Sequence, residues 1–193
     1  MPCELVTVGC SWGGLAAVGC LLDVLPAAFP AAVVIAQHRG PAPSALAELL
    51  GRTSAWPVAE AEDKEPIVPG RAYLAPAAYH LLVEPGRLAL STEAPVRVSR
   101  PSIDVLFETA ADAYGDKVVG VVLTGANDDG AAGVVRIVER GGTVLVQDPE
   151  TAERAEMPLA AIATGVPVTV VPLERMASAL AAVCEAPPVE GAR

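Results

Sequence analysis

The sequence predicts one α/β domain, a parallel sheet flanked by helices on both faces, with an antiparallel β-hairpin added. Short runs rich in valine and alanine alternate with segments whose apolar residues recur at helical spacing, a pattern typical of parallel strands joined by right-handed crossovers. The 193 residues are 52% hydrophobic but only 4% aromatic, which suits small aliphatic side chains packed between helices and a sheet. A Pro-Gly turn at 85–86 separates two β-rich runs, as in a hairpin. This length is enough for one domain and short for two.

The first third of the chain is expected to form two buried strands, each followed by a helix. Apolar side chains recur at helical spacing from Gly13 to Val24, and Pro26 and Pro30 end that unit. Gly51 is expected to end the second helix. The expected elements are a strand over 4–9, a helix over 13–24, a strand over 31–37, a helix over 43–51 and a weaker strand over 57–63.

The rest of the chain is expected to form the hairpin and then three strands that alternate with helices. The hairpin pairs Leu81–Glu84 with Arg87–Ser91. Ser102 is the predicted N-cap of the next helix, and Gly115 is predicted to close it. The expected elements are an extended run over 71–75, helices over 103–114, 129–139, 157–165 and 174–185, and strands over 117–125, 143–148 and 168–173. Residues 1–185 then form the domain, and 186–193 are expected to be a flexible tail.

The composition excludes several classes of protein. A formal net charge of -10 would repel phosphate backbones, so no nucleic-acid partner is expected. The four cysteines form no C-x-x-C pair and only two histidines are present, so no metal site is expected. The cysteines are expected to be reduced thiols in a cytoplasmic protein. No Lys or Arg precedes Arg39, so no signal peptide is expected. The longest apolar region, 5–36, is interrupted by Asp23 and two prolines, and membrane insertion is not expected.

Polar side chains follow three predicted strands, at the edge where ligands gather in open parallel sheets. The segment GCSWGG at 9–14 follows the first strand, and QHR at 37–39 follows the second. The segment TGANDDG at 124–130 follows the strand that begins near Lys117. One hydroxyl, one imidazole and one pair of carboxylates are therefore expected to emerge at the same edge of the sheet.

Ser11 lies in a G-x-S-x-G turn between a strand and a helix, which is the pattern of a nucleophile elbow. Glycines permit the tight turn, and the first N–H groups of the helix could stabilise an oxyanion. His38 is the candidate base for the serine proton, and Asp128 or Asp129 could orient it. Plainer interpretations are open: Ser11 as a helix N-cap, His38 as a hydrogen-bonded residue at a strand end, and the aspartates as caps of the next helix.

Five other residues have interpretations of their own. Trp12 is expected to shape a pocket wall or simply to be exposed. Arg39 and Arg100 could contact an acidic substrate or could be ordinary surface charges. Cys10, next to Ser11, is expected to face the core, and His80 in the hairpin is expected to be structural.

Seven segments in a fixed order carry a resemblance to a known family. They are VGCSWGGL, IAQHRG, PGRAYLAPAAYHLLVE, RPSIDVLFETAADAYG, VGVVLTGANDDGAAG, GGTVLVQDPETAERAEMPLAAI and VVPL. Over nearly its whole length the chain resembles the catalytic domain of the CheB family, the chemotaxis protein-glutamate methylesterases. The resemblance implies a parallel α/β sheet with a hairpin and a catalytic triad of Ser11, His38 and Asp129. It also selects Asp129 over Asp128.

The resemblance implies a reaction and a partner as well. The family hydrolyses γ-glutamyl methyl esters on the cytoplasmic helices of methyl-accepting chemoreceptors, and some members deamidate receptor glutamines. No metal and no organic cofactor is implied. Members often carry an N-terminal receiver domain, whereas this chain begins at the first catalytic strand. A stand-alone catalytic domain, or a fragment, is therefore expected, and the sequence does not indicate its oligomeric state.

Departures from the family's pattern surround the expected site. Trp12 stands where the best-known members carry Thr, Ala126 and Asn127 where they carry Met-Gly, and Arg39 where an apolar residue is usual. Trp12, Ala126 and Asn127 are expected to line the oxyanion pocket, and the backbone N–H of Ala126 could still serve the oxyanion. The departures motivate two alternatives. One is a small-molecule carboxylesterase on the same site, and the other is a catalytically silent module that binds receptor helices.

Overall fold

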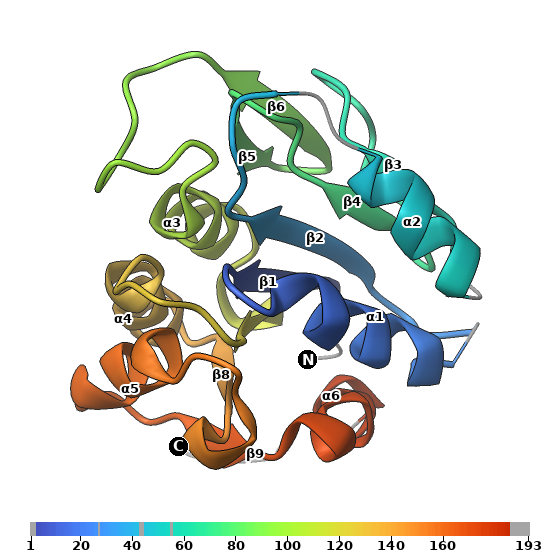
Figure 1. Cartoon of the computed structure of the whole chain (residues 1–193). Helices are drawn as coiled ribbons and strands as arrows, with labels where there is room; N and C mark the ends of the chain where they lie inside the picture. The colour runs from blue at the N-terminus through green and yellow to red at the C-terminus, as the bar shows by residue number, and fades with distance from the viewer. Residues whose placement is uncertain (1–2, 27, 43–44, 55, 186–193) are drawn as a thin grey trace.

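A sheet of seven parallel strands forms the centre of the molecule (Figure 1). In spatial order the strands are β3 (Val58–Glu60), β4 (Ala72–Leu74), β2 (Ala32–Gln37), β1 (Leu5–Cys10), β7 (Val118–Val122), β8 (Thr143–Gln147) and β9 (Thr169–Val171). The computed structural model describes residues 3–26, 28–42, 45–54 and 56–185. The expected flexible tail at 186–193 lies outside these described residues.

Strand β1 lies in the middle of the sheet, and the chain adds later strands first on one side of β1 and then on the other. One side of β1 pairs with β2, and Cys10 aligns with Gln37. The other side pairs with β7, and Gly9 aligns with Val122. The loops that leave these three strands therefore start at one edge of the sheet, at the kind of switch point where α/β folds place their ligands.

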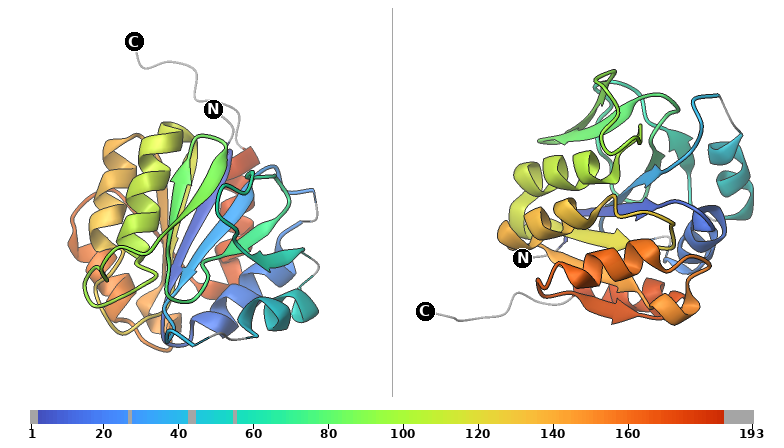
Figure 2. Two further views of the ribbon diagram at one scale, coloured as in Figure 1. Left: turned by 90° about the horizontal axis from the view of Figure 1, so that it is seen from above. Right: turned by 60° about the vertical axis from the view of Figure 1, so that its left-hand side comes forward.

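Helices cover both faces of the sheet (Figure 2), as the alternating sequence pattern predicts. Their bounds are α1 (Gly14–Val24), α2 (Leu46–Thr53), α3 (Ile103–Tyr114), α4 (Ala131–Glu139), α5 (Glu156–Ala163) and α6 (Met176–Glu185). Short 3-10 turns lie at Gly115–Lys117, Pro149–Thr151 and Leu173–Arg175. No helix among the described residues is long and apolar enough to cross a membrane.

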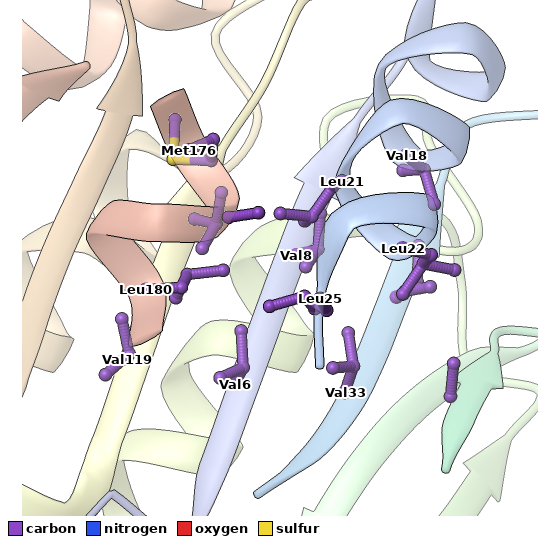
Figure 3. Packing of buried hydrophobic residues seen from close by; sticks show 14 of the residues in the cluster. Val6, Val8, Val18, Leu21, Leu22, Leu25, Val33, Val119, Met176 and Leu180 are labelled. Carbon is purple, nitrogen blue, oxygen red and sulfur yellow. The ribbon is translucent and has the colours of Figure 1, made fainter. Parts of the chain in front are cut away.

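Two apolar clusters, one on each face of the sheet, make up the core. On one face, Val6 and Val8 of β1 pack with side chains of α1 and α6, as Figure 3 shows. On the other face, Leu5 packs with a cluster that includes Phe107 of α3. The side chains of β1 alternate between the clusters because successive strand residues point to opposite faces. Strand β1 is thus covered on both sides, which fixes the position of the turn that follows it.

The predicted hairpin is confirmed as β5 (His80–Glu84) paired antiparallel with β6 (Arg87–Ser91). It forms a two-stranded sheet of its own, separate from the central sheet. The backbone N–H of Val83 donates to Thr109 Oγ1 at 3.1 Å, which joins the hairpin to α3. The hairpin and α3 therefore form one packed unit that leads into the loop before Ser102.

Several predicted boundaries are wrong. Helix α2 passes Gly51 and ends at Thr53, because Gly51 has no positive φ and the Ser54 N–H closes the helix by bonding Leu50 O at 3.0 Å. Residues 43 and 44 of its predicted start lie outside the described residues. Strand β3 stops at Glu60, since the chain turns before Lys64, which has a φ of 64°. Helix α4 begins at Ala131 because Gly130, with a φ of 102°, is its N-cap.

Candidate active site

Backbone contacts from two directions hold the turn that carries Ser11. The N–H of Ser11 donates to the Thr124 carbonyl at 2.9 Å, which joins the end of β1 to the loop after β7. Gly13 has a φ of 76°, and a Cβ there would lie 2.9 Å from Glu153 Cβ, so the turn requires glycine at this position. Gly13, and not Ser11, is the N-cap of α1, and no side chain caps that helix. The N-cap interpretation of Ser11 is therefore wrong.

His38 follows β2, and its imidazole ring lies between Asp129 and Asn127. Nε2 lies 2.6 Å from Asp129 Oδ2, and Nδ1 lies 3.2 Å from Asn127 Nδ2. An amide nitrogen can only donate, so Nδ1 accepts and the proton of the neutral ring is assigned to Nε2, facing Asp129. This tautomer leaves Nδ1 as the nitrogen that can take up a proton.

The Asp129 carboxylate is buried and receives four hydrogen bonds. Oδ1 accepts from Ser102 Oγ and from the N–H of Asp104, each at 3.0 Å. Oδ2 accepts from His38 and from the N–H of Ile103 at 2.8 Å. Ile103 and Asp104 begin α3, and the N-terminus of a helix favours negative charge.

Burial and hydrogen bonding act in opposite directions on Asp129. Burial by itself would raise the pKa of Asp129. Hydrogen bonds from His38 and from the backbone of Asp104 and Ile103 outweigh burial and hold the pKa below its ordinary value. Asp129 is therefore ionised at neutral pH, with its charge next to the Nε2 proton of His38.

A second buried carboxylate, that of Asp104 on α3, bonds back to the start of α4. Asp104 lies in the first turn of α3, and its Oδ1 accepts the N–H groups of Gly130 and Gly133 at 2.9 Å each, at the start of α4. The loop before α4 thus supplies Asp129 to α3, while α3 supplies Asp104 to α4. We call this arrangement the reciprocal cap. Burial raises the pKa of Asp104 above its ordinary value, against the hydrogen bond from Gly133.

Part of the environment of Asp129 was not predicted from the sequence. Ser102 caps α3 as predicted, accepting the Val105 N–H at 3.5 Å, but it also donates to Asp129. Asp104 was not a candidate, although a carboxylate in the first turn after a Ser N-cap is a recognisable signal. His80 is structural, as expected: it is buried, and its Nδ1 accepts the Ser102 N–H at 3.2 Å.

Gln37 connects the segments of Ser11 and His38. Its Nε2 donates to the Ser11 carbonyl at 2.7 Å and to the His38 carbonyl at 3.1 Å. No hydrogen bond joins the Ser11 hydroxyl to His38, both of which are described residues. Cys10 faces the core, as expected, and donates to Gln37 Oε1 at 2.9 Å. Burial raises the pKa of the Cys10 thiol, so it stays protonated and is not a nucleophile.

The three residues expected around the oxyanion pocket differ in their surroundings. The Trp12 side chain is 59% exposed, and its Nε1 donates to Glu153 at 2.7 Å while the Arg154 guanidinium lies 5.6 Å from its ring centre. Ala126 is exposed and makes no hydrogen bond with either ring nitrogen of His38. Of these three residues, Asn127 is the one whose side chain makes a hydrogen bond with His38. The structure therefore places Trp12 against the 153–154 loop and Asn127 against the imidazole.

An open cleft of about 280 Å³ adjoins His38, and both candidate arginines line it. Arg39 pairs with Glu60 at 2.7 Å and donates to the Ala75 carbonyl at 2.5 Å. Arg100 donates to two backbone carbonyls of the 92–93 segment at 2.9 Å. Both arginines therefore reach the cleft while also holding neighbouring loops. Within the described residues, no group of three or more His, Cys, Asp or Glu side chains is placed to hold a metal ion.

Comparisons with known proteins show which family this chain belongs to. Residues 6–180 match the family model described as CheB methylesterase. A Leptospira interrogans protein, provisionally named protein-glutamate methylesterase/protein-glutamine glutaminase, is 45% identical over 179 residues, which cover 92% of this chain and 93% of that protein. Protein-glutamate methylesterase FrzG of Myxococcus xanthus is 40% identical over 93% of this chain and 54% of its own length.

A solved structure shares the fold. The crystal structure of the Thermotoga maritima CheB methylesterase catalytic domain superposes with a TM-score of 0.88 at 33% sequence identity. The match covers 94% of this chain and 98% of that one. The match to the family model, the similar relatives and the shared fold all lead to one assignment. The chain belongs to the CheB methylesterase family.

Proposed function

We propose that this chain is a protein-glutamate methylesterase that hydrolyses glutamyl methyl esters on the cytoplasmic helices of methyl-accepting chemoreceptors. The observation that carries the proposal is the 2.6 Å contact of His38 with buried Asp129, at the sheet edge where Ser11 follows β1. The names of the relatives support the reaction, and a cytoplasmic location follows from such a substrate. Ser11 is the proposed nucleophile, His38 the base, and Asp129 the group that holds the imidazole.

The first half of the reaction forms an acyl-enzyme. The Ser11 hydroxyl attacks the ester carbonyl while His38 Nδ1 takes its proton, and the Asp129 charge stabilises the imidazolium that results. The backbone N–H groups of Trp12 and Ala126 have no hydrogen-bond partner among the described residues, which makes them our candidates for the oxyanion site. The imidazolium returns the proton to the departing oxygen, and methanol leaves.

The second half of the reaction restores the enzyme. Water loses a proton to His38 Nδ1 and attacks the acyl carbonyl. The bond to Ser11 Oγ then breaks, the imidazolium returns the proton to that oxygen, and the free glutamate side chain leaves. A glutamine substrate would follow the same steps with ammonia as the leaving group. None of the steps calls for a metal ion or an organic cofactor. The open cleft next to His38 would receive the substrate segment, with Arg39 and Arg100 on its rim.

The deciding experiment measures methanol release from a radiomethylated chemoreceptor cytoplasmic fragment. Ser11→Ala should abolish release, since loss of a triad nucleophile costs orders of magnitude in rate. The matched control is Ser178→Ala, an exposed serine of α6 whose loss should leave the rate unchanged. Full activity in Ser11→Ala would refute the nucleophile.

Two alternative functions give different results in the same experiment. A small-molecule carboxylesterase would hydrolyse short acyl esters quickly and leave the methylated receptor intact. A silent binding module would bind the receptor fragment without releasing methanol, and its Ser11 would not react with a fluorophosphonate. Labelling of Ser11 together with receptor hydrolysis would exclude both alternatives.

A further inference from the structure

The amide of Asn127 lies at the nitrogen of His38 that the proposed mechanism needs. Asn127 Nδ2 is 3.2 Å from His38 Nδ1. The other end of the amide is fixed as oxygen, because the backbone N–H of Asp129 donates to Oδ1 at 3.3 Å. The NH2 group is therefore the end that faces His38, and it donates to the ring nitrogen.

A hydrogen bond donated to Nδ1 stabilises only the unprotonated form of the ring. If Nδ1 took a proton, its N–H would face the N–H of Asn127, and two donors cannot bond each other. Uptake of the Ser11 proton therefore requires the Asn127 amide to turn away. In the structure Asn127 occupies Nδ1 and the Ser11 hydroxyl does not.

We propose that Asn127 is a positioning residue that keeps the resting site latched, by occupying Nδ1 of His38 until a substrate displaces its amide. The carbonyl oxygen of an incoming ester is an acceptor and offers the Asn127 NH2 group an alternative partner. The latch opposes protonation of His38 and slows attack by Ser11 when no substrate is bound. The inference rests on the proposed role of His38 as the base.

The charged side chains around His38 are paired with groups other than the Asn127 side chain. Asp129, from the loop before α4, holds Nε2, and Asp104 on α3 lies behind it. Arg39 on the segment of His38 pairs with Glu60 of β3. Arg97, before α3, lies 3.3 Å from Asp104 and pairs with Asp128. Among the described residues, only Asn127 makes a hydrogen bond with Nδ1.

The test measures the rate at which a fluorophosphonate labels Ser11 between pH 5 and 9, with no receptor present. In Asn127→Ala, the midpoint of the acid limb should rise by about one pH unit, because a hydrogen bond specific to the neutral ring is lost. In Asn127→Asp the midpoint should rise further, since a carboxylate accepts from the protonated ring. A merely structural role would lower the rate at every pH without moving the midpoint, and that outcome overturns the latch.

The matched control is Asp128→Asn. It interchanges aspartate and asparagine, as Asn127→Asp does, but at the neighbouring residue. Asp128 pairs with Arg97 and does not contact His38, so loss of its negative charge should leave the midpoint unchanged or lower it. A rise equal to that of Asn127→Ala would mean that any change to this loop moves the midpoint, and that loss of the Asn127 amide is not the specific cause. The latch would then be wrong.

A second measurement follows the ring directly. The chain has two histidines, so the His38 resonance in an NMR titration can be assigned by comparison with His38→Gln. In the unlabelled protein its midpoint should rise in Asn127→Ala, and an unchanged midpoint overturns the latch. If the midpoint moves but the methylated receptor is never hydrolysed, the proposed function fails and the latch stands.

Discussion

Asp129→Asn tests the centre of the site, because it keeps the shape of the side chain and removes its charge. Each oxygen of Asp129 accepts two hydrogen bonds. In Asp129→Asn, the amide NH2 group must therefore replace an oxygen that faces two donors. At Oδ2 it would oppose the backbone N–H of Ile103. At Oδ1 it would oppose the backbone N–H of Asp104, and neither backbone group can turn away. Every amide orientation therefore leaves one buried N–H unpaired.

The magnitude follows from these contacts. A buried donor left unpaired costs about 1–3 kcal/mol, and the remaining hydrogen bonds weaken because their acceptor is no longer charged. We expect a loss of about 3 kcal/mol in the free energy of unfolding, or about 6–12 °C in melting temperature for a chain of this size. The rate should fall about ten-thousand-fold, as in serine-protease triads whose aspartate becomes asparagine, because the tautomer of His38 is no longer enforced.

The assay pairs urea unfolding with methanol release from the methylated receptor fragment. Asp128→Asn serves as the control, because Asp128 is exposed and its pair with Arg97 lies at the surface. Its stability should change by less than about 0.5 kcal/mol, and its rate by less than about threefold. Wild-type stability in Asp129→Asn would show that the four hydrogen bonds do not hold α3. A rate within tenfold of wild type would show that Asp129 does not orient the base.

Three further predictions concern pH, the Ser11 turn and the cleft. The pKa of Asp129 is lowered in the folded protein. The ionised carboxylate therefore contributes fully to stability above about pH 4, and this contribution is lost as the pH falls through the folded pKa. In urea titrations, the unfolding free energy of wild type should fall more between pH 5 and pH 3 than that of Asp129→Asn. Gly13→Ala should cost about 1–2 kcal/mol in thermal unfolding, because the φ of Gly13 is 76°. Gly19→Ala should be stabilising, because Gly19 lies in α1 and a Cβ there would meet no atom within 4 Å. Equal effects of the two substitutions would contradict the strained turn. Arg39→Glu should weaken receptor hydrolysis, seen as a raised KM, and an unchanged KM would exclude Arg39 from substrate contact.

The position of the site could be predicted from the sequence because it depends on topology. Once the strands before Ser11, His38 and Thr124 are recognised as parallel, their carboxyl ends must share one edge of the sheet. The hairpin and the Ser102 cap were predictable because turn and cap chemistry is local. Gly51 misled because a glycine near a helix end favours termination only where the backbone adopts a positive φ.

The detailed contacts of the site could not be predicted, because they depend on how side chains from distant segments approach each other. The reciprocal cap joins Asp104 and Asp129, which lie on different elements and acquire partners only when α3 and α4 pack together. The contact of Asn127 with His38 spans 89 positions between those residues along the chain. Sequence pattern placed Asn127 near the pocket but carried no information about which ring nitrogen its amide would meet.

The reciprocal cap has a consequence for how inactive forms of this protein can arise. A substitution that removes the Asp129 carboxylate also loosens the start of α3, so the variant protein would be scarcer in the cell as well as slower. Substitution of Ser11 should not lower stability in this way, because its hydroxyl makes no hydrogen bond with another described residue. Substitution of Ser11, the proposed nucleophile, and not of Asp129, is therefore expected to give a stable, abundant form that binds the proposed receptor substrate without turning it over.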